Sequence, residues 1–343
     1  MSTEKLISIH LNSNKAENFE KFINSIIKNT NNIEILEVLV SIDQDDSYMK
    51  DKVNEINSNY PTLITYYETD LIKTFADAWK PLNILLLNTS ETVKYITCMS
   101  DDIEFETKDW DKIILSYNNY FEDNIFRIRC SKYRNEKYVD IWECGYKPDS
   151  YAFYTKKWLD IVRMWNPCIG PDSFQECISF YMKTYGQEYN RDVINQEIIF
   201  RGQEVSSGLN FKNRINRSRI YYKAFYRLVS YRIQKIACKK SHNIVCNISK
   251  KNTKIRNISF IKYSFTNFIR RFNFFYYRGS PNHIINSKIK NIAYIAWCYM
   301  GFLDNILIKI TYFLYDKKIL KKIIKDEKKM KKITDVIEYE RIP

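Results

Sequence analysis

Short aliphatic runs alternate with segments of helical periodicity through the first hundred residues. Four runs have the length and the Ile or Val content of buried strands, at residues 6–11, 38–42, 63–67 and 93–99. Three intervening segments carry apolar residues at helical spacing, at residues 16–29, 48–57 and 71–87. Repeated strand–helix units with short connections are typical of a parallel or mixed sheet covered by helices. The pattern therefore predicts an α/β fold.

Acidic residues stand at the ends of two of these strands. Asp43 ends the second run, and Asp101 and Asp102 follow the fourth. In open α/β sheets, ligands bind outside the carboxyl ends of the strands. Crowded carboxylates repel one another unless a cation neutralises them, and hard oxygen ligands suit Mg²⁺ or Mn²⁺. Two interpretations stay open at this point: a solvated acidic turn, or a divalent-metal site that binds a diphosphate.

Scarce residue types exclude several other chemistries. With only 7 Gly, the chain has neither a G-x-G-x-x-G dinucleotide fingerprint nor a G-K-[ST] phosphate loop. With only 3 His, a His-rich metal site and a Ser–His–Asp triad are both disfavoured.

The order and spacing of these motifs resemble the nucleotide-sugar-binding domain of GT-A glycosyltransferases, in particular the inverting family-2 type of bacterial surface-polysaccharide assembly. The resemblance implies a GT-A type mixed sheet flanked by helices. It places Asn12 and Ser13 in the base-contacting turn, although the usual Pro-Thr-Tyr is missing, and it assigns Asp43 to holding the base. Asn83 closes an Ala-x-x-x-x-Asn pattern that begins at Ala78, and it joins the donor-binding set.

The metal motif of the family falls on residues 100–102, Ser-Asp-Asp. Ser100 replaces its first Asp, which leaves Asp102 as the expected metal ligand and Asp101 as a ribose or metal partner. The resemblance thus implies Mn²⁺ or Mg²⁺ as cofactor and a UDP- or GDP-sugar as donor.

An inverting transfer needs a carboxylate that removes the proton of the attacking hydroxyl. The family places this base at a helix start beyond the metal motif. Asp172, in Gly-Pro-Asp-Ser-Phe, is the first candidate, and Glu176 one turn later is the second. Asp172 is equally well explained as the cap of that helix.

The charge of the chain is divided unequally. Residues 1–200 hold 22 basic and 32 acidic side chains, whereas the remainder holds 32 basic and 8 acidic ones. We therefore expect a catalytic domain at residues 1–210 and a basic, aromatic, mainly helical region at residues 211–343. Residues 317–325 fit a basic amphipathic helix, as found at anionic membrane surfaces. Nucleic-acid binding and simple solvation of these charges are the less favoured alternatives.

Together these features predict an inverting, metal-dependent glycosyltransferase of cell-surface polysaccharide synthesis that uses a glycan or lipid-linked acceptor. No secretory signal is evident, the 8 Cys show no C-x-x-C pair, and the apolar stretch at residues 292–303 is too short to span a membrane. We therefore expect a cytoplasmic protein bound peripherally to the inner face of the cell membrane. A retaining GT-A transferase and a non-catalytic membrane- or nucleic-acid-binding protein are the alternatives.

Overall fold

A computed structural model describes residues 4–70, 79–130, 149–167, 171–202, 231–251 and 253–254. The chain divides after Tyr263 into two units, and all the described residues belong to the first. A helix from beyond residue 210 packs within the first unit. The domain boundary expected at residue 210 stays a prediction. Ala78 and the basic helix and apolar stretch of the C-terminal region lie outside the described residues.

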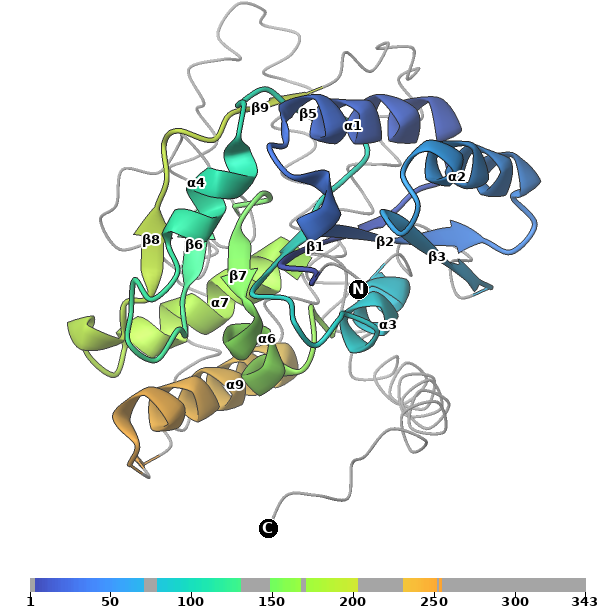
Figure 1. Cartoon of the computed structure of the whole chain (residues 1–343). Coiled ribbons are helices and arrows are strands. Elements are labelled where there is room, and N and C mark those ends of the chain that lie inside the picture. Colours follow the sequence, from blue (N-terminus) through green and yellow to red (C-terminus); the bar gives the residue numbers. More distant parts are fainter. Residues whose placement is uncertain are drawn as a thin grey trace, which may run out of the picture. The chain divides into compact units, whose positions relative to one another are not determined.

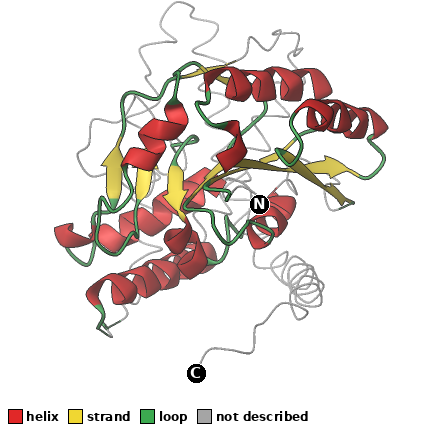
Figure 2. Cartoon of the chain, viewed as in Figure 1, coloured by secondary structure: helices red, strands yellow, loops and turns green. Residues whose placement is uncertain are grey.

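Strands and helices alternate along the described chain (Figures 1 and 2). Up to residue 116 the elements are β1 (Ile7–Asn12), α1 (Ala16–Asn29), η1 (Ile33–Ile35), β2 (Leu36–Asp43), α2 (Ser47–Asn59), β3 (Ile64–Thr69), α3 (Trp79–Leu87), β4 (Tyr95–Cys98), β5 (Ile103–Phe105) and α4 (Trp110–Ser116). Those that follow are β6 (Arg127–Arg129), β7 (Phe153–Thr155), α6 (Lys156–Val162), α7 (Pro171–Lys183), η3 (Gln187–Tyr189), β8 (Asp192–Ile194), β9 (Phe200–Gly202) and α9 (Tyr231–Ser249).

The main sheet has the strand order β3-β2-β1-β4-β7-β6-β8. Strands β1 to β4 are parallel, and β7 runs antiparallel between β4 and β6. The chain moves from β1 to β2 to β3 in one direction and then crosses back, so that β4 lies on the other side of β1. The sheet therefore has a topological switch point between β1 and β4, the place where open α/β sheets bind ligands.

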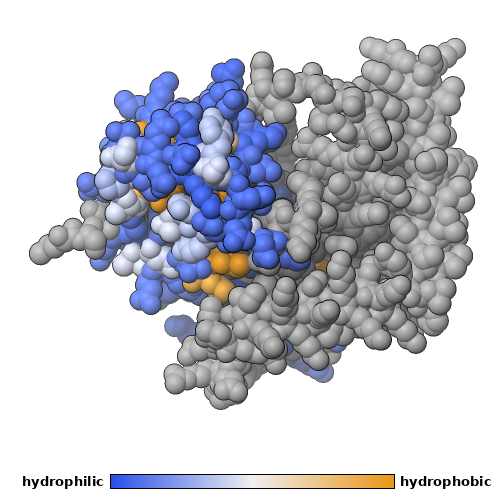
Figure 3. Space-filling model, turned by 90° about the vertical axis from the view of Figure 1, so that its right-hand side faces the viewer, coloured by the Kyte–Doolittle hydropathy of each residue, from blue (hydrophilic) through white to orange (hydrophobic). Residues whose placement is uncertain are grey.

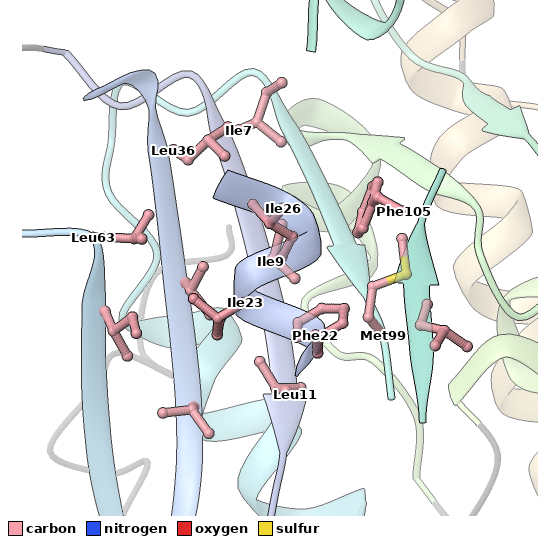
Figure 4. Close-up of a cluster of buried hydrophobic side chains, with 14 of the residues drawn as sticks. Ile7, Ile9, Leu11, Phe22, Ile23, Ile26, Leu36, Leu63, Met99 and Phe105 are labelled. Atoms are coloured by element: carbon pink, nitrogen blue, oxygen red, sulfur yellow. The ribbon is translucent and has the colours of Figure 1, made fainter. Parts of the chain in front are cut away.

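Helices cover both faces of this sheet, because the strand residues alternate between two hydrophobic clusters. Ile7, Ile9 and Leu11 face the cluster that contains the buried sides of α1, α2 and α4. Leu39 and Ile96 face the opposite cluster, which is built from α3, α6, α7 and α9. Figure 4 shows the first cluster, in which side chains of β1 point toward those of α1.

Helix α1 illustrates why these segments become amphipathic helices. Phe19, Phe22, Ile23 and Ile26 follow helical spacing, and all four are fully buried against the sheet. The surface of the described residues is mostly hydrophilic on the side that Figure 3 presents, as expected when apolar side chains gather inside.

The structure confirms the predicted mixed sheet flanked by helices. The short strands β8 and β9 belong to different sheets, since β8 joins the main sheet and β9 pairs with β5. Within the described residues, no helix is long and apolar enough to cross a membrane.

Candidate functional site

The carboxyl ends of the four parallel strands bring the predicted donor-site residues to one edge of the sheet. Asn12 is the last residue of β1 and Ser13 follows it, while Asp43 is the last residue of β2. Asp101 and Asp102 follow β4, the neighbour of β1 across the switch point. Residues that lie far apart in the sequence are thus gathered at the edge where a ligand is expected.

A hydrogen bond joins the segments that follow β1 and β4 at the switch point. The Ser13 hydroxyl donates to Asp101 Oδ2 at 2.5 Å. Burial and the neighbouring charge of Asp102 raise the pKa of Asp101, while the Ser13 hydrogen bond and the charge of Lys15 oppose this shift. The short bond fixes the Asp101 carboxylate beside the end of β1.

Asp102 is partly exposed, and its Oδ1 accepts a hydrogen bond from the Ser100 hydroxyl. Within the described part of the chain, no group of three or more Asp, Glu, His or Cys side chains is placed to hold a metal ion. Mg²⁺ is commonly held by one or two carboxylates together with substrate phosphates, and Mn²⁺ prefers the same oxygen ligands. The donor set of Asp102, with Asp101 beside it, fits such a shared site and does not fit a metal held by protein alone.

A polar hollow of about 520 Å³ lies farther along the same edge. It is lined by residues at the ends of β2 and β3, namely Asp43, Gln44, Asp45, Thr69 and Asp70. Burial and the charges of Asp45 and Asp46 raise the pKa of Asp43. The hollow offers carboxylate oxygens to a ligand that presents hydrogen-bond donors.

Asp172 is the second residue of α7. Its Oδ2 accepts a hydrogen bond from the Ser150 hydroxyl at 3.0 Å, and its Oδ1 accepts one from the Ser173 amide at 2.8 Å. Burial raises the pKa of Asp172. The charges of Asp102 and Asp172 both act on the Tyr151 hydroxyl, so the expected metal ligand and the expected base lie around the same side chain.

Glu176 has a different environment from the one that a base needs. Its Oε2 accepts a hydrogen bond from Arg127 Nη2 at 2.9 Å, and both side chains are almost completely buried. Burial favours a higher pKa for Glu176, but Arg127 and Arg129 outweigh it and lower the pKa. The structure therefore places Glu176 in a buried ion network, where it stays ionised and bonded to arginine.

Asn83 bonds to backbone at both ends of its amide. Its Oδ1 accepts from the Trp165 amide at 2.7 Å, and its Nδ2 donates to the Asn166 carbonyl at 2.9 Å. These contacts hold the segment before α7 against α3. They give Asn83 a structural task, while its expected donor contact stays a prediction.

Several residues of this region were not singled out from the sequence. Thr69 ends β3 just as Asp43 ends β2, and Asp70 follows it, so the search for polar residues at strand ends that found Asp43 also finds these two on the third strand. Asp149, Ser150 and Tyr151 precede β7, and no spacing in the sequence connects them to Asp172.

Comparisons with known proteins give structural likenesses only. No protein-family model matches the chain, and no curated protein matches it significantly. Mannosyltransferase PcManGT from Pyrobaculum calidifontis, in complex with GDP-Man and Mn²⁺, is similar with a TM-score of 0.49 and 12% identity, over 92% of this chain and 89% of that one. S. aureus TarS 1-349, in complex with UDP-GlcNAc, is similar with a TM-score of 0.42 and 13% identity, over 69% of this chain and 72% of that one.

A third similar structure is 4-diphosphocytidyl-2C-methyl-D-erythritol synthase from Anaerococcus prevotii DSM 20548. It has a TM-score of 0.38 and 12% identity, over 62% of this chain and 96% of that one. At these scores and identities, none of the three likenesses establishes an activity for this chain. Its function has to be inferred from its own site.

Proposed function

We propose that this chain is a divalent-metal-dependent glycosyltransferase that moves a sugar from a nucleoside-diphosphate sugar to an acceptor hydroxyl. The observation that supports this most is the carboxylate pair at the switch point. Asp101 is fixed there by Ser13, and Asp102 lies beside it with its side chain partly exposed. A diphosphate at this edge completes the oxygen ligand set that Mg²⁺ or Mn²⁺ requires.

The donor lies along the carboxyl ends of β1 to β4 in this proposal. Its base occupies the hollow beside Asp43, whose carboxylate accepts hydrogen bonds from base N–H groups. Asn12 and Ser13 lie between the hollow and Asp101, because β1 separates β2 from β4. Asp102 holds the metal ion, which when bound supplies positive charge to the departing diphosphate.

Asp172 is the proposed general base, and the proposed stereochemical course is inversion. The acceptor oxygen forms a bond to the anomeric carbon as the bond from that carbon to the diphosphate oxygen breaks. The hydroxyl proton passes to the Asp172 carboxylate, and the nucleoside diphosphate leaves. The raised pKa of Asp172 favours this proton transfer near neutral pH.

We further propose a glycan or lipid-linked acceptor of surface-polysaccharide synthesis, reached from the cytoplasmic face of a membrane. The support is the unequal charge, since the 143 residues after Phe200 hold 32 basic against 8 acidic side chains. Such a region is attracted to anionic lipid headgroups. Nucleic acid is the less favoured partner.

Substitution of Asp102 tests the central claim. Thermal unfolding and calorimetry with UDP, GDP, CDP and ADP, each with and without Mn²⁺, are expected to show metal-dependent binding of one nucleotide. Asp102→Asn is expected to abolish the metal dependence and to lower sugar transfer by about a hundredfold or more, because one charged ligand is lost. Glu106→Gln removes a charge from an exposed residue nearby and serves as the control.

Two results would contradict the proposal. The absence of any shift across the nucleotide panel would favour the non-catalytic alternative. Unchanged metal dependence in Asp102→Asn would remove Asp102 from the metal site.

A further inference from the structure

A small cavity lies behind the proposed base. Its volume of about 10 Å³ is close to the roughly 10–15 Å³ that one water molecule needs. It is lined by side chains at the end of β4, around β7 and at the start of α7, namely Cys98, Asp149, Ser150, Ala152, Tyr154, Trp165 and Asp172. A polar cavity of this size is suited to a single bound water.

Two deeply buried polar atoms line this cavity and lack a hydrogen-bond partner within the described part of the chain. They are Asp149 Oδ2 and the Tyr154 hydroxyl oxygen, which lies beside the buried Arg127 guanidinium, so that the Tyr154 O–H is left as a donor in need of an acceptor. Asp149 is 1% exposed and Tyr154 is 2% exposed. Arg129 Nε lies 3.6 Å from Asp149 Oδ2, which is too far for a hydrogen bond. Buried polar atoms are nearly always satisfied by protein or by ordered water, so both atoms point to a water site.

Asp149 is also connected to Asp172 through the neighbouring residue Ser150. Ser150 directly follows Asp149, and its hydroxyl donates to Asp172 Oδ2 at 3.0 Å. Asp149 Oδ1 accepts from the Tyr151 amide at 3.2 Å, which fixes the carboxylate and leaves Oδ2 for another donor. Asp149 and Asp172 are thus linked through Ser150, which follows Asp149 and bonds Asp172, and both line the same cavity.

We propose that the cavity binds one ordered water that accepts a hydrogen bond from Tyr154 and donates to both Asp149 and Asp172. Asp149 is then a positioning residue, which acts on the carboxyl group of Asp172 through this water. All three hydrogen bonds are compatible with one water molecule, which has two donors and can accept at least one bond. The role of Asp172 in sugar transfer rests on the proposed function, whereas the water site does not.

The surrounding charges set the direction of the expected effects. Arg127 and Arg129 of β6 and Glu176 of α7 face Asp149, and the charge of Asp149 acts on Cys130. Glu176 also acts on Asp172, whose own charge acts on Cys98 and Tyr151. Burial raises the pKa of Asp149 to about 6, and above that pH its charge faces Asp172 across the shared cavity, so removing this charge is expected to lower the pKa of Asp172. Losing the donor water raises it, because the charged form loses a hydrogen bond.

A crystal structure of the full chain at a resolution that shows ordered water is the first test. A water peak within about 3.2 Å of Asp149 Oδ2, of the Tyr154 hydroxyl and of an Asp172 oxygen is the expected result. A cavity without density, or a water bound to only one of these groups, overturns the proposal.

Carboxyl titration by ¹³C NMR on aspartate-labelled protein is the second test, with the Asp172 signal assigned from Asp172→Asn. Asp149→Asn is expected to lower the midpoint of Asp172 by about 0.5 pH units or more, and Tyr154→Phe to raise it by a similar amount, a threefold change in proton affinity. Tyr181→Phe removes a buried hydroxyl that bonds Gln234 instead, and it is expected to leave the midpoint unchanged.

The readouts separate failure of this inference from failure of the proposed function, since neither requires sugar transfer. Suppose that the Asp172 midpoint falls in Asp149→Asn and rises in Tyr154→Phe, but the protein has no transferase activity. This result would support the water site and contradict the proposed function. Unshifted midpoints in an active transferase would overturn the inference, as would an equal shift in the Tyr181 control. Tyr154→Phe keeps the ring packing, so it decides the question even if Asp149→Asn does not fold.

Discussion

His10 is an ionisable side chain that β1 buries completely inside the sheet. The Trp165 indole N–H donates to His10 Nδ1 at 2.9 Å, and His10 Nε2 lies 3.0 Å from the Ser8 hydroxyl and 3.1 Å from the Thr89 hydroxyl. Because Nδ1 accepts, the proton of the neutral ring lies on Nε2. A second proton would break the indole bond, and burial lowers the pKa of His10 to about 3.

The stability of the fold is therefore expected to fall in acid. Between pH 6.5 and about pH 3 the unfolded chain protonates this histidine and the folded chain does not, so protons favour unfolding. This histidine is expected to make the free energy of unfolding about 3 kcal/mol lower at pH 4 than at pH 7. Urea unfolding at both pH values should show that His10→Asn lacks this difference. The matched control is His242→Asn, which is expected to keep it. A pH dependence that is the same in His10→Asn and in the unsubstituted protein would contradict the assignment.

Asp172 allows a kinetic prediction at the same scale. Asp172→Asn keeps the shape of the side chain but removes the base, so kcat is expected to fall by roughly 10²–10⁴ while nucleotide affinity stays the same. Asp160→Asn, in an exposed carboxylate on α6, is the control. Product configuration read by NMR should show inversion. A retained configuration with nearly normal kcat in Asp172→Asn would indicate the retaining alternative.

Strand ends read from local periodicity placed Asp43, Asp101 and Asp102 at one edge, and the family resemblance added Ser13. Sequence reasoning could not assign the environment of Glu176, since its partner Arg127 lies 49 residues earlier and the pairing depends on tertiary packing. The alternative role of Asp172 was that of a helix N-cap, which precedes the first turn. The structure places Asp172 inside the first turn of α7.

Strand β6 and helix α7 are joined by a buried ion network. Arg127 is 0% exposed and donates to Glu176 of α7 at 2.9 Å and to Asp192 of β8 at 2.7 Å. Lys183 at the end of α7 also bonds Asp192 at 2.7 Å. Since α7 carries Asp172 in its first turn, this network fixes the helix that presents the proposed base.

Arg127→Met is expected to lower the free energy of unfolding by about 3–5 kcal/mol, because two carboxylates stay buried without their partner. Lys156→Met breaks an exposed pair with Asp160 and should cost about 0.5 kcal/mol or less. Urea unfolding measures both. Adding Glu176→Gln and Asp192→Asn to Arg127→Met should restore part of the loss. A cost below about 1 kcal/mol for Arg127→Met would show that the network is solvated.

Element prediction succeeded where a segment was long and periodic. Helix α1 has the predicted bounds, and β2 and α2 extend the predicted ones by two residues or fewer at each end. The small sheet of β5 and β9 was missed because each strand has only three residues, and their partners lie almost a hundred residues apart. A window so short carries no measurable period.

At the scale of the whole molecule, the charge of the C-terminal region predicts membrane binding. Five lysines of the amphipathic pattern lie outside the described residues, at Lys317, Lys318, Lys321, Lys322 and Lys325. Each cation near an anionic surface contributes about 1 kcal/mol. Replacing all five by Gln in the full chain is therefore expected to weaken binding to phosphatidylserine vesicles by roughly a hundredfold or more.

Vesicle flotation measures this effect, with two controls. Binding to uncharged phosphatidylcholine vesicles should be weak for both proteins. A second variant replaces five exposed lysines of the first unit, at Lys21, Lys28, Lys108, Lys157 and Lys250. Equal losses in the two lysine variants would indicate attraction by net charge alone, which contradicts a membrane-binding segment.

The bond between His10 and Trp165 spans 155 residues, and this matters while the chain is being made. At about 5–20 residues per second, Trp165 leaves the ribosome roughly 8–30 s after His10. Until then, β1 to β3 can assemble on the ribosome, but the imidazole ring has no indole beside it and β4 has no β7 to pair with. The nascent chain thus assembles its first parallel strands early, while the part of the sheet that β7 completes stays open. Slow translation between residues 100 and 165 prolongs the time before β7 and Trp165 are made. During that time, chaperones or other chains can reach the unpaired edge of β4.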